Sequence, residues 1–357
     1  MNYNRSWSKR HSLSASAIGL YEHNLTDYSG SVDARDKSIT RYGQIGASYS
    51  FNAPKISASL GLGWSWIATL LNRNKSLSDF PYVDLSVRYI PRKKHSISGV
   101  LHYSVWPPNS NYKSENIIHV SPYLWYTGNP MLKSHRSYDI GLNYTIIPSN
   151  RFNMTAFAST WMVGNRDAFV YEQTPEGIIR TIRQPIGSFL DFNYGINASV
   201  KQLDGKLHIS GQLAQRIVHN GEPFDTNRSV FTFYLQAMYY AGPFNFAISY
   251  QSENGTHNYS ANSGVWTREK DFFVVQAGWS NSVWNISLMA NNLQRWNWRA
   301  THDTMSSPYY SFSRWVSNAF CHAFIRLSAT YTFGFGKKVN LNNDLFRQSG
   351  ASSGILK

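Results

Sequence analysis

The chain has 357 residues, of which 15% are aromatic and only 15% are charged, and its formal net charge is +14. Soluble domains usually contain about 25% charged residues, so this composition instead fits a protein with a wet interior, an apolar outside and aromatic girdles. No run of about 18 apolar residues is present, which excludes a helical membrane span. The compact basic groups, Arg92-Lys93-Lys94 and Lys337-Lys338, fall at expected turn or end positions. We therefore expect no nucleic acid partner and a basic surface that faces anionic lipid.

Segments in which apolar and polar residues alternate follow one another along the chain, a pattern typical of β-strands. In the third of them, Leu60, Leu62 and Trp64 alternate with serine and glycine. We expect about fourteen strands, within residues 12–21, 41–51, 55–66, 83–89, 97–105, 138–146, 151–163, 190–200, 207–213, 231–239, 244–250, 273–279, 284–290 and 319–333.

Short turns and long polar loops alternate between these strands. The short turns are centred near residues 53, 93, 149, 204, 242 and 282, and Asp204-Gly205 suits a turn with positive φ. The long loops fall near 22–39, 67–79, 107–135, 164–188, 219–228, 253–267 and 294–317. Separation of short turns from long loops is typical of an antiparallel up-and-down transmembrane β-barrel, with the short turns periplasmic.

The polar face of each strand then points into the lumen, where water solvates it. We predict that the lumen-facing polar residues include Asp84, Arg88, Asp191, His322 and Arg326. Since backbone groups in lipid must all be paired, a closed sheet is the β-structure that spans a membrane.

Two motifs add a family resemblance. Thr127-Gly128-Asn129-Pro130-Met131-Leu132 precedes the strand Tyr138–Tyr144, and the chain contains Leu288–Leu293 and Leu327–Lys338, the latter with Tyr331-Thr332-Phe333-Gly334-Phe335-Gly336. Together with the aromatic-rich hairpins between them, these segments resemble the C-terminal barrel part of TonB-dependent outer-membrane receptors, in the outer membrane protein β-barrel family.

The resemblance implies a barrel of about 22 strands, an N-terminal plug domain, and nutrient import driven through TonB. We expect residues 1–338 to form the C-terminal part of the barrel and 339–357 a disordered periplasmic tail. Because no plug, TonB box or signal segment is recognised here, we expect a fragment, with TonB as a partner only if a plug exists. The other expected partners are outer-membrane lipid, lipopolysaccharide and the barrel assembly machinery.

Two other functions remain open from the residues alone. One is a self-contained fourteen-stranded porin or hydrophobic-solute channel. The other is an outer-membrane hydrolase, for which His302-Asp303 is the candidate acid–histidine pair, although no Gly-x-Ser-x-Gly motif accompanies it.

Aromatic residues with arginine in the loops are the ligand-binding candidates, because their rings stack on sugars or other flat ligand surfaces. They are Trp125, Tyr126, Trp296, Trp298, Arg299, Tyr309, Tyr310 and Trp315. The eleven histidines form no metal-binding motif, and Cys321 is the single cysteine, expected on the apolar face of the last strand. We therefore predict no metal, no cofactor and no catalytic residues.

Overall fold

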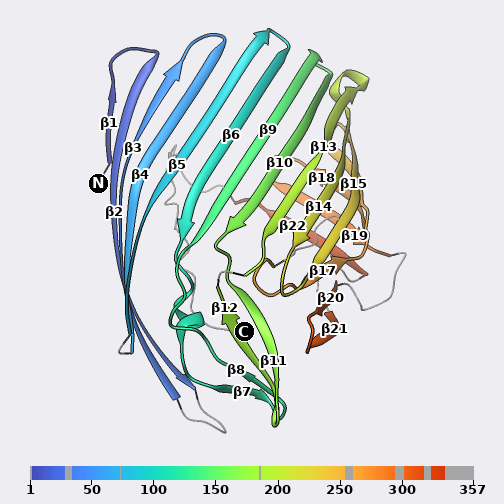
Figure 1. Ribbon diagram of the computed structural model, residues 1–357. Coiled ribbons are helices and arrows are strands. Elements are labelled where there is room, and N and C mark those ends of the chain that lie inside the picture. Colours follow the sequence, from blue (N-terminus) through green and yellow to red (C-terminus); the bar gives the residue numbers. More distant parts are fainter. Residues whose placement is uncertain are drawn as a thin grey trace.

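A computed structural model describes residues 2–28, 34–72, 74–184, 186–253, 260–293, 301–316 and 323–333. Fifteen antiparallel strands form its main sheet (Figure 1). Each strand is hydrogen-bonded to the next in the order β1 (Asn2–Ser6), β2 (His11–Tyr28), β3 (Ala34–Asn52), β4 (Ile56–Leu71), β5 (Asn74–Arg92), β6 (His95–Trp106), β9 (His135–Ser149), β10 (Phe152–Gly164), β13 (Phe189–Gln202), β14 (Leu207–Asn220), β15 (Thr226–Ala241), β16 (Phe244–Gln251), β18 (Phe272–Ser280), β19 (Trp284–Asn291) and β22 (Phe324–Tyr331).

The fourteen predicted strands are all present among these fifteen. Sequence alone missed β1, because Asn2–Ser6 is almost entirely polar and shows no alternation. For the last predicted strand, the described residues confirm Phe324–Tyr331, whereas 317–322 lie outside the described part of the chain. The predicted tail, 339–357, also lies outside it.

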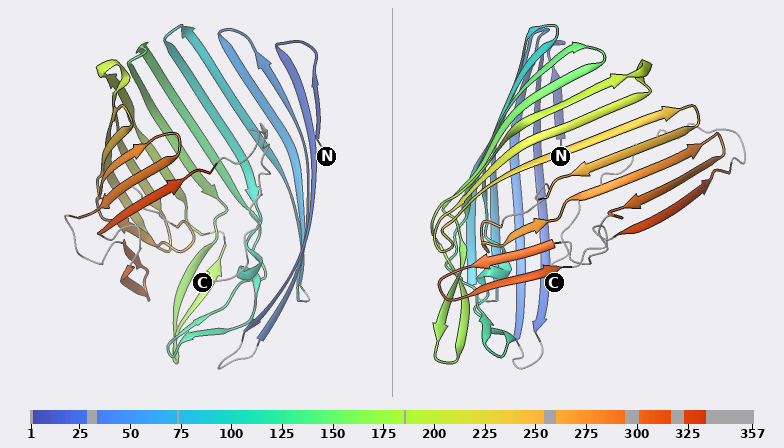
Figure 2. Two further views of the ribbon diagram at one scale, coloured as in Figure 1. Left: turned by 180° about the vertical axis from the view of Figure 1, so that it is seen from behind. Right: turned by 90° about the vertical axis from the view of Figure 1, so that its right-hand side faces the viewer.

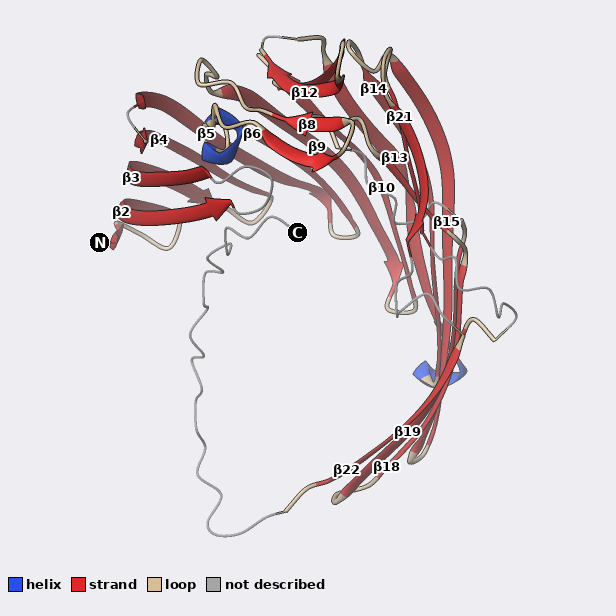
Figure 3. Ribbon diagram, turned by 90° about the horizontal axis from the view of Figure 1, so that it is seen from below, coloured by secondary structure: helices blue, strands red, loops and turns tan. Residues whose placement is uncertain are grey.

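The sheet is curved but not closed. Its two edges are β1 and β22, which are not paired with each other in the described residues. Viewed along the strands, the sheet forms an open arc (Figure 3). The prediction of an antiparallel sheet is therefore confirmed, whereas this chain by itself forms a curved wall rather than a ring.

Several predicted loops are wrong, because the strands extend through them. Residues 22–39 belong mostly to β2 and β3, and 67–79 mostly to β4 and β5. The strands β3 and β5 have 19 residues each, or roughly 60 Å at about 3.3 Å per residue, whereas a membrane-crossing strand needs about 9–11 residues. Polar contacts support these extensions: Asn72 donates from Nδ2 to Asp36 Oδ1 over 2.7 Å. Sheet pairing thus continues where apolar alternation has ended.

Two small sheets lie at the end of the wall opposite the short turns (Figures 1 and 2). A four-stranded sheet contains β7 (Ile118–Ser121), β8 (Leu124–Tyr126), β11 (Ala168–Thr174) and β12 (Gly177–Arg183), and a three-stranded sheet contains β17 (Trp266–Glu269), β20 (Thr301–Ser306) and β21 (Ser311–Val316). We call these seven strands the cap. The segments predicted as long polar loops at 107–135, 164–188, 253–267 and 294–317 therefore contain strands in their described residues.

The two sheets of the cap share a hydrophobic core. Phe169 and Tyr171 of β11 pack in one cluster with Met305 of β20, and each is at most 6% exposed. Short 3-10 segments, η1 (Ser110–Lys113) and η2 (Leu203–Gly205), complete the fold. In η2, Asp204 and Gly205 have φ angles of 52° and 86°, as predicted for this turn. No helix among the described residues is both long and apolar enough to cross a membrane.

The alternation predicted from the sequence divides the main sheet into two faces. Large apolar side chains cover one face and stay exposed, for example Ile45, Leu62, Leu142 and Ile196 at 52%, 51%, 55% and 43%. Residues on the other face are smaller and less accessible, and Ser65 is only 3% exposed. The apolar face is therefore the outer, convex face, and the polar face is the inner wall of the curve.

Candidate functional site

A row of polar side chains crosses the inner wall of the sheet. Asp84 of β5 lies opposite His102 of β6, which lies opposite Asp139 of β9. Asp139 lies opposite Trp161 of β10, which lies opposite Asp191 of β13. Directly opposed residues of antiparallel strands share a face, so the register brings three carboxylates, an imidazole and an indole into one row. Asp139 and Trp161 were not singled out from the sequence, although the two-residue period places them there.

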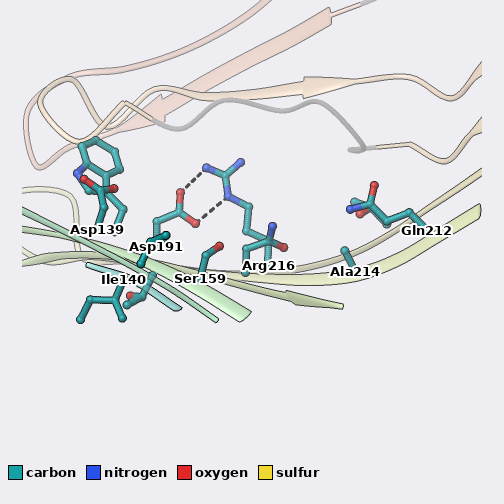
Figure 4. A pocket seen from close by; sticks show the side chains of 13 residues that line it. Asp139, Ile140, Ser159, Asp191, Gln212, Ala214 and Arg216 are labelled. Atoms are coloured by element: carbon teal, nitrogen blue, oxygen red, sulfur yellow. Dashed lines mark hydrogen bonds and ion pairs between the residues drawn. The ribbon is translucent and has the colours of Figure 1, made fainter. Parts of the chain in front are cut away.

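At one end of the row, Asp191 forms a bidentate ion pair with Arg216 of β14 (Figure 4). The Nε of Arg216 donates to Oδ1 over 2.9 Å, and Nη2 donates to Oδ2. The Asp191 side chain is 12% exposed and that of Arg216 is 25% exposed. Paired N–H donors on one carboxylate fix both groups in position. Arg216 was missed by sequence analysis, yet its polar-face position was detectable from the alternation in β14.

This ion pair lines a cavity of about 410 Å³ on the inner wall. The polar residues that line it are Asp139, Ser159, Thr160, Trp161, Asp191, Asn193, Gln212, Arg216 and Thr232. The Trp161 ring is held by an Nε1–H bond of 2.8 Å to Ser137 Oγ and by edge contact with Phe189 at 4.9 Å between centroids. The cavity thus combines several hydrogen-bonding groups with one fixed indole, which suits a polar ligand with a flat or ring-shaped part.

The cap covers part of the inner wall beside this cavity. Trp266 of β17 packs with Val163, Phe189 and Val218, three buried residues that share the face of Asp191 by register. Arg228 lies over the Trp266 ring, with its guanidinium carbon 5.7 Å from the centroid. The polar wall is therefore enclosed at the end of the strands where the cap lies.

Two of the predicted ligand-binding aromatics are part of the packing of the cap. The guanidinium carbon of Arg180 lies 3.2 Å from the Tyr126 ring centroid and 4.2 Å from that of Phe169. The Tyr310 ring stacks on Tyr171 at 4.7 Å. Tyr126 and Tyr310 both pack against the same core of the cap, so the structure brings these two candidates together as neighbours of a hydrophobic cluster.

The other candidates in the described residues lie apart from each other. Trp125 donates from Nε1 to His119 Nδ1 over 2.9 Å. Trp315 is 40% exposed and stacks on His302 with centroids 4.3 Å apart. Tyr309 is 56% exposed. Trp296, Trp298 and Arg299 lie outside the described residues, so ligand contact by this group stays a prediction.

The predicted lumen-facing residues follow the register of the sheet. Asp84 and Asp191 belong to the inner-wall row, and Arg88 lies on the same face of β5 as Asp84. Arg326 lies opposite Met289, between the apolar positions Ile325 and Leu327 of β22. His322 lies outside the described residues. Their exposure to an aqueous lumen stays a prediction.

A buried arginine that sequence analysis did not single out joins the cap to the wall. Arg166 is fully buried and donates to backbone carbonyls of three separate segments, at Ile186, Gly221, Glu222 and Ala261. The Nε bond to Ile186 is 3.1 Å and the Nη1 bond to Ala261 is 3.0 Å. Nothing in the local sequence distinguishes this arginine from a solvent-exposed loop residue, because its partners lie far along the chain.

The Tyr171 hydroxyl gives the cap a dependence on alkaline pH. Burial raises the pKa of Tyr171 to about 12 from its ordinary value of 10.0. In the unfolded chain the Tyr171 phenol ionises at lower pH than in the folded chain. The stability that the neutral phenol contributes to the cap is therefore complete below about pH 10 and is lost as the pH rises through about 12. We expect a loss of about 2–3 kcal/mol over this interval. Near-UV circular dichroism during alkaline titration measures it, and Tyr171→Phe should remove this part of the pH dependence; an unchanged titration would contradict it.

The predicted hydrolase pair does not form a catalytic arrangement. Asp303 accepts hydrogen bonds from Thr267 Oγ1 over 2.8 Å and from Arg314 Nε over 3.0 Å. His302 instead contacts Ser313 Oγ through Nε2 over 2.7 Å. Adjacent residues of a strand point to opposite faces, so Asp303 does not orient His302. Within the described ranges, no three His, Cys, Asp or Glu residues are arranged to hold a metal ion.

Comparison with solved structures finds the same wall in larger barrels. The copper transporter OprC superposes with a TM-score of 0.63 at 10% sequence identity, covering 81% of this chain and 49% of that chain. The FrpB iron transporter from Neisseria meningitidis superposes at 0.63 and 11% identity, covering 93% and 54%. The alcaligin outer-membrane receptor FauA from Bordetella pertussis superposes at 0.52 and 13% identity, covering 84% and 51%. The fold of the main sheet is similar to that of part of the barrels of these TonB-dependent outer-membrane receptors.

The resemblance predicted from the Thr127–Leu132 motif and the chain end is therefore confirmed at the level of the fold. The chain spans about half the length of these three structures. No protein-family model matches the sequence. A search of curated proteins also found no match.

Proposed function

We propose that the chain forms the C-terminal wall of a barrel of about 22 strands that transports a scarce nutrient across the outer membrane. Metals and metal chelates are the favoured substrate class. The observation that supports this proposal best is the likeness to FrpB, named as an iron transporter, over 93% of the present chain. OprC, named as a copper transporter, supports the same class.

The two faces of the sheet provide a physical basis for this role. The outer apolar side chains contact lipid, and the inner polar row lines the passage, where water and the substrate solvate it. The remaining strands and a plug domain complete the barrel, and TonB acts on that plug. The basic surface contacts lipopolysaccharide, and the barrel assembly machinery inserts the sheet, whose unpaired edges in lipid would be costly.

Uptake by cells tests the proposal. Cells with the gene intact, deleted or restored are starved of metal and supplied with radioactive iron chelates or copper, with and without a protonophore. We expect deletion to abolish energy-dependent uptake of one of these metals, and the protonophore to lower uptake in intact cells to the same level. Uptake that requires the gene but resists the protonophore would instead indicate a passive channel. Unchanged uptake in the deleted cells would contradict a role in metal import.

A further inference from the structure

A second cavity, of about 360 Å³, lies on the inner wall of β3 to β6. Four of its lining residues are aromatic: Tyr42, Phe80, Tyr82 and Trp106. They alternate in sequence with outer-face residues and therefore belong to the polar face, which elsewhere carries mostly small or hydrophilic side chains. Asp84 and His102 of the inner-wall row complete the lining. Four aromatic residues beside an acidic group distinguish this cavity from the one beside Arg216, where Trp161 is the single aromatic residue of the lining.

The sheet is shaped to hold one of these rings against the wall. Gly63 of β4 lies opposite Tyr82, and a side chain added at Gly63 or at Gly46 of β3 would clash with the Tyr82 ring. The neighbouring Tyr42 hydroxyl donates to Gln44 Oε1, which orients a second ring. Phe80 is 6% exposed, so its ring is also fixed by packing. The cavity is therefore preformed by the fold.

This cavity contains one carboxylate, although the chain as a whole has a net charge of +14. Its carboxylate, Asp84, contacts the Nδ1 of His102. Among the residues that the structure describes, no lysine or arginine lines the cavity, whereas the carboxylate of Asp191 in the other cavity is matched by Arg216. The Asp84 side chain is 53% exposed, so a bound cation can reach it.

We propose that this cavity binds the ammonium group of a small organic cation. Aromatic faces attract cations through their quadrupole, and quaternary ammonium ligands are recognised by such aromatic cages. Asp84 supplies the balancing charge, and Tyr82 and Phe80 supply fixed rings. This binding goes beyond the proposed metal uptake and does not depend on it, since contacts within the chain hold the rings of Tyr42, Phe80 and Tyr82.

Equilibrium dialysis of radiolabelled choline against the full chain, purified from outer membranes in detergent, tests the proposal. The neutral isostere 3,3-dimethyl-1-butanol has the same shape without the charge, and we expect it to bind about tenfold more weakly. This comparison uses the unmodified chain, so it does not depend on the folding of a variant. Equal binding of the two compounds, or no binding of choline, would overturn the proposal.

Variants locate the binding to this cavity. We expect Asp84→Asn to weaken choline binding about fivefold and Tyr82→Leu to weaken it as well, whereas Asp191→Asn, in the other cavity, should leave it unchanged. Loss of choline binding in Asp191→Asn but not in Asp84→Asn would contradict the assignment.

Discussion

Replacing Arg166 with alanine is expected to destabilise the cap by about 3–5 kcal/mol. The guanidinium is fully buried and donates to carbonyls at Ile186, Ala261 and the Gly221-Glu222 segment. Alanine removes these donors, and the buried carbonyls lose partners that water cannot replace without opening the cap. Arg166→Lys should recover only part of the loss, because one ammonium group cannot reach three separate segments at once.

Limited trypsin digestion at increasing urea concentration measures this effect, since the cap and the segments that Arg166 joins contain several lysines and arginines. Arg183→Ala is the matched control: its side chain is 60% exposed and pairs with Glu172 on the surface, so we expect a change of less than about 1 kcal/mol. If Arg166→Ala and the native chain resist trypsin up to the same urea concentration, the buried arginine does not stabilise the cap.

Replacing Leu142 with arginine is expected to destabilise the folded sheet in lipid by about 2–4 kcal/mol. Leu142 lies on the outer face of β9 and is 55% exposed in the isolated chain, so the account places it against lipid. The guanidinium of an arginine at this position must be transferred from water into hydrocarbon, which destabilises the folded state. Asn143→Arg is the matched control. It introduces the same side chain at the neighbouring position of β9, on the inner wall, and we expect little change in stability there.

Urea-induced unfolding from lipid vesicles compares the two arginine variants. The account requires Leu142→Arg to unfold at lower urea concentration than Asn143→Arg. Similar unfolding of both variants would mean that the two faces of β9 meet the same surroundings, which a lipid-spanning wall does not allow.

Most strands of the main sheet were predictable from the sequence, because apolar and polar residues alternate wherever one face of a strand contacts an apolar environment. The alternation located Leu142 outside and Asp191 inside, and the positive φ of Asp204 and Gly205 followed from their residue types. Alternation stops where strands extend into water, so the continuation of β3 to Ala34 was not predictable from it.

The candidate site was less accessible to sequence analysis. Asp84 and Asp191 were found as inner-face residues, but the row that joins them depends on register, which pairs residues from five strands. Arg166 and the stacking of Tyr310 on Tyr171 depend on contacts between distant segments, for which no local pattern exists. The contact of Tyr126, a predicted ligand-binding residue, with Arg180 likewise joins distant segments.

Cysteine accessibility along β9 tests the central claim most directly. Single cysteines replace residues 139 to 144 one at a time, in a chain with Cys321→Ser, and a water-soluble maleimide is applied to intact outer membranes and to detergent-solubilised protein. We expect that in membranes the labelling alternates, with residues 140, 142 and 144 protected by lipid and 139, 141 and 143 accessible. Uniform labelling, or protection of the second set instead, would contradict a membrane-spanning wall with a polar inner face.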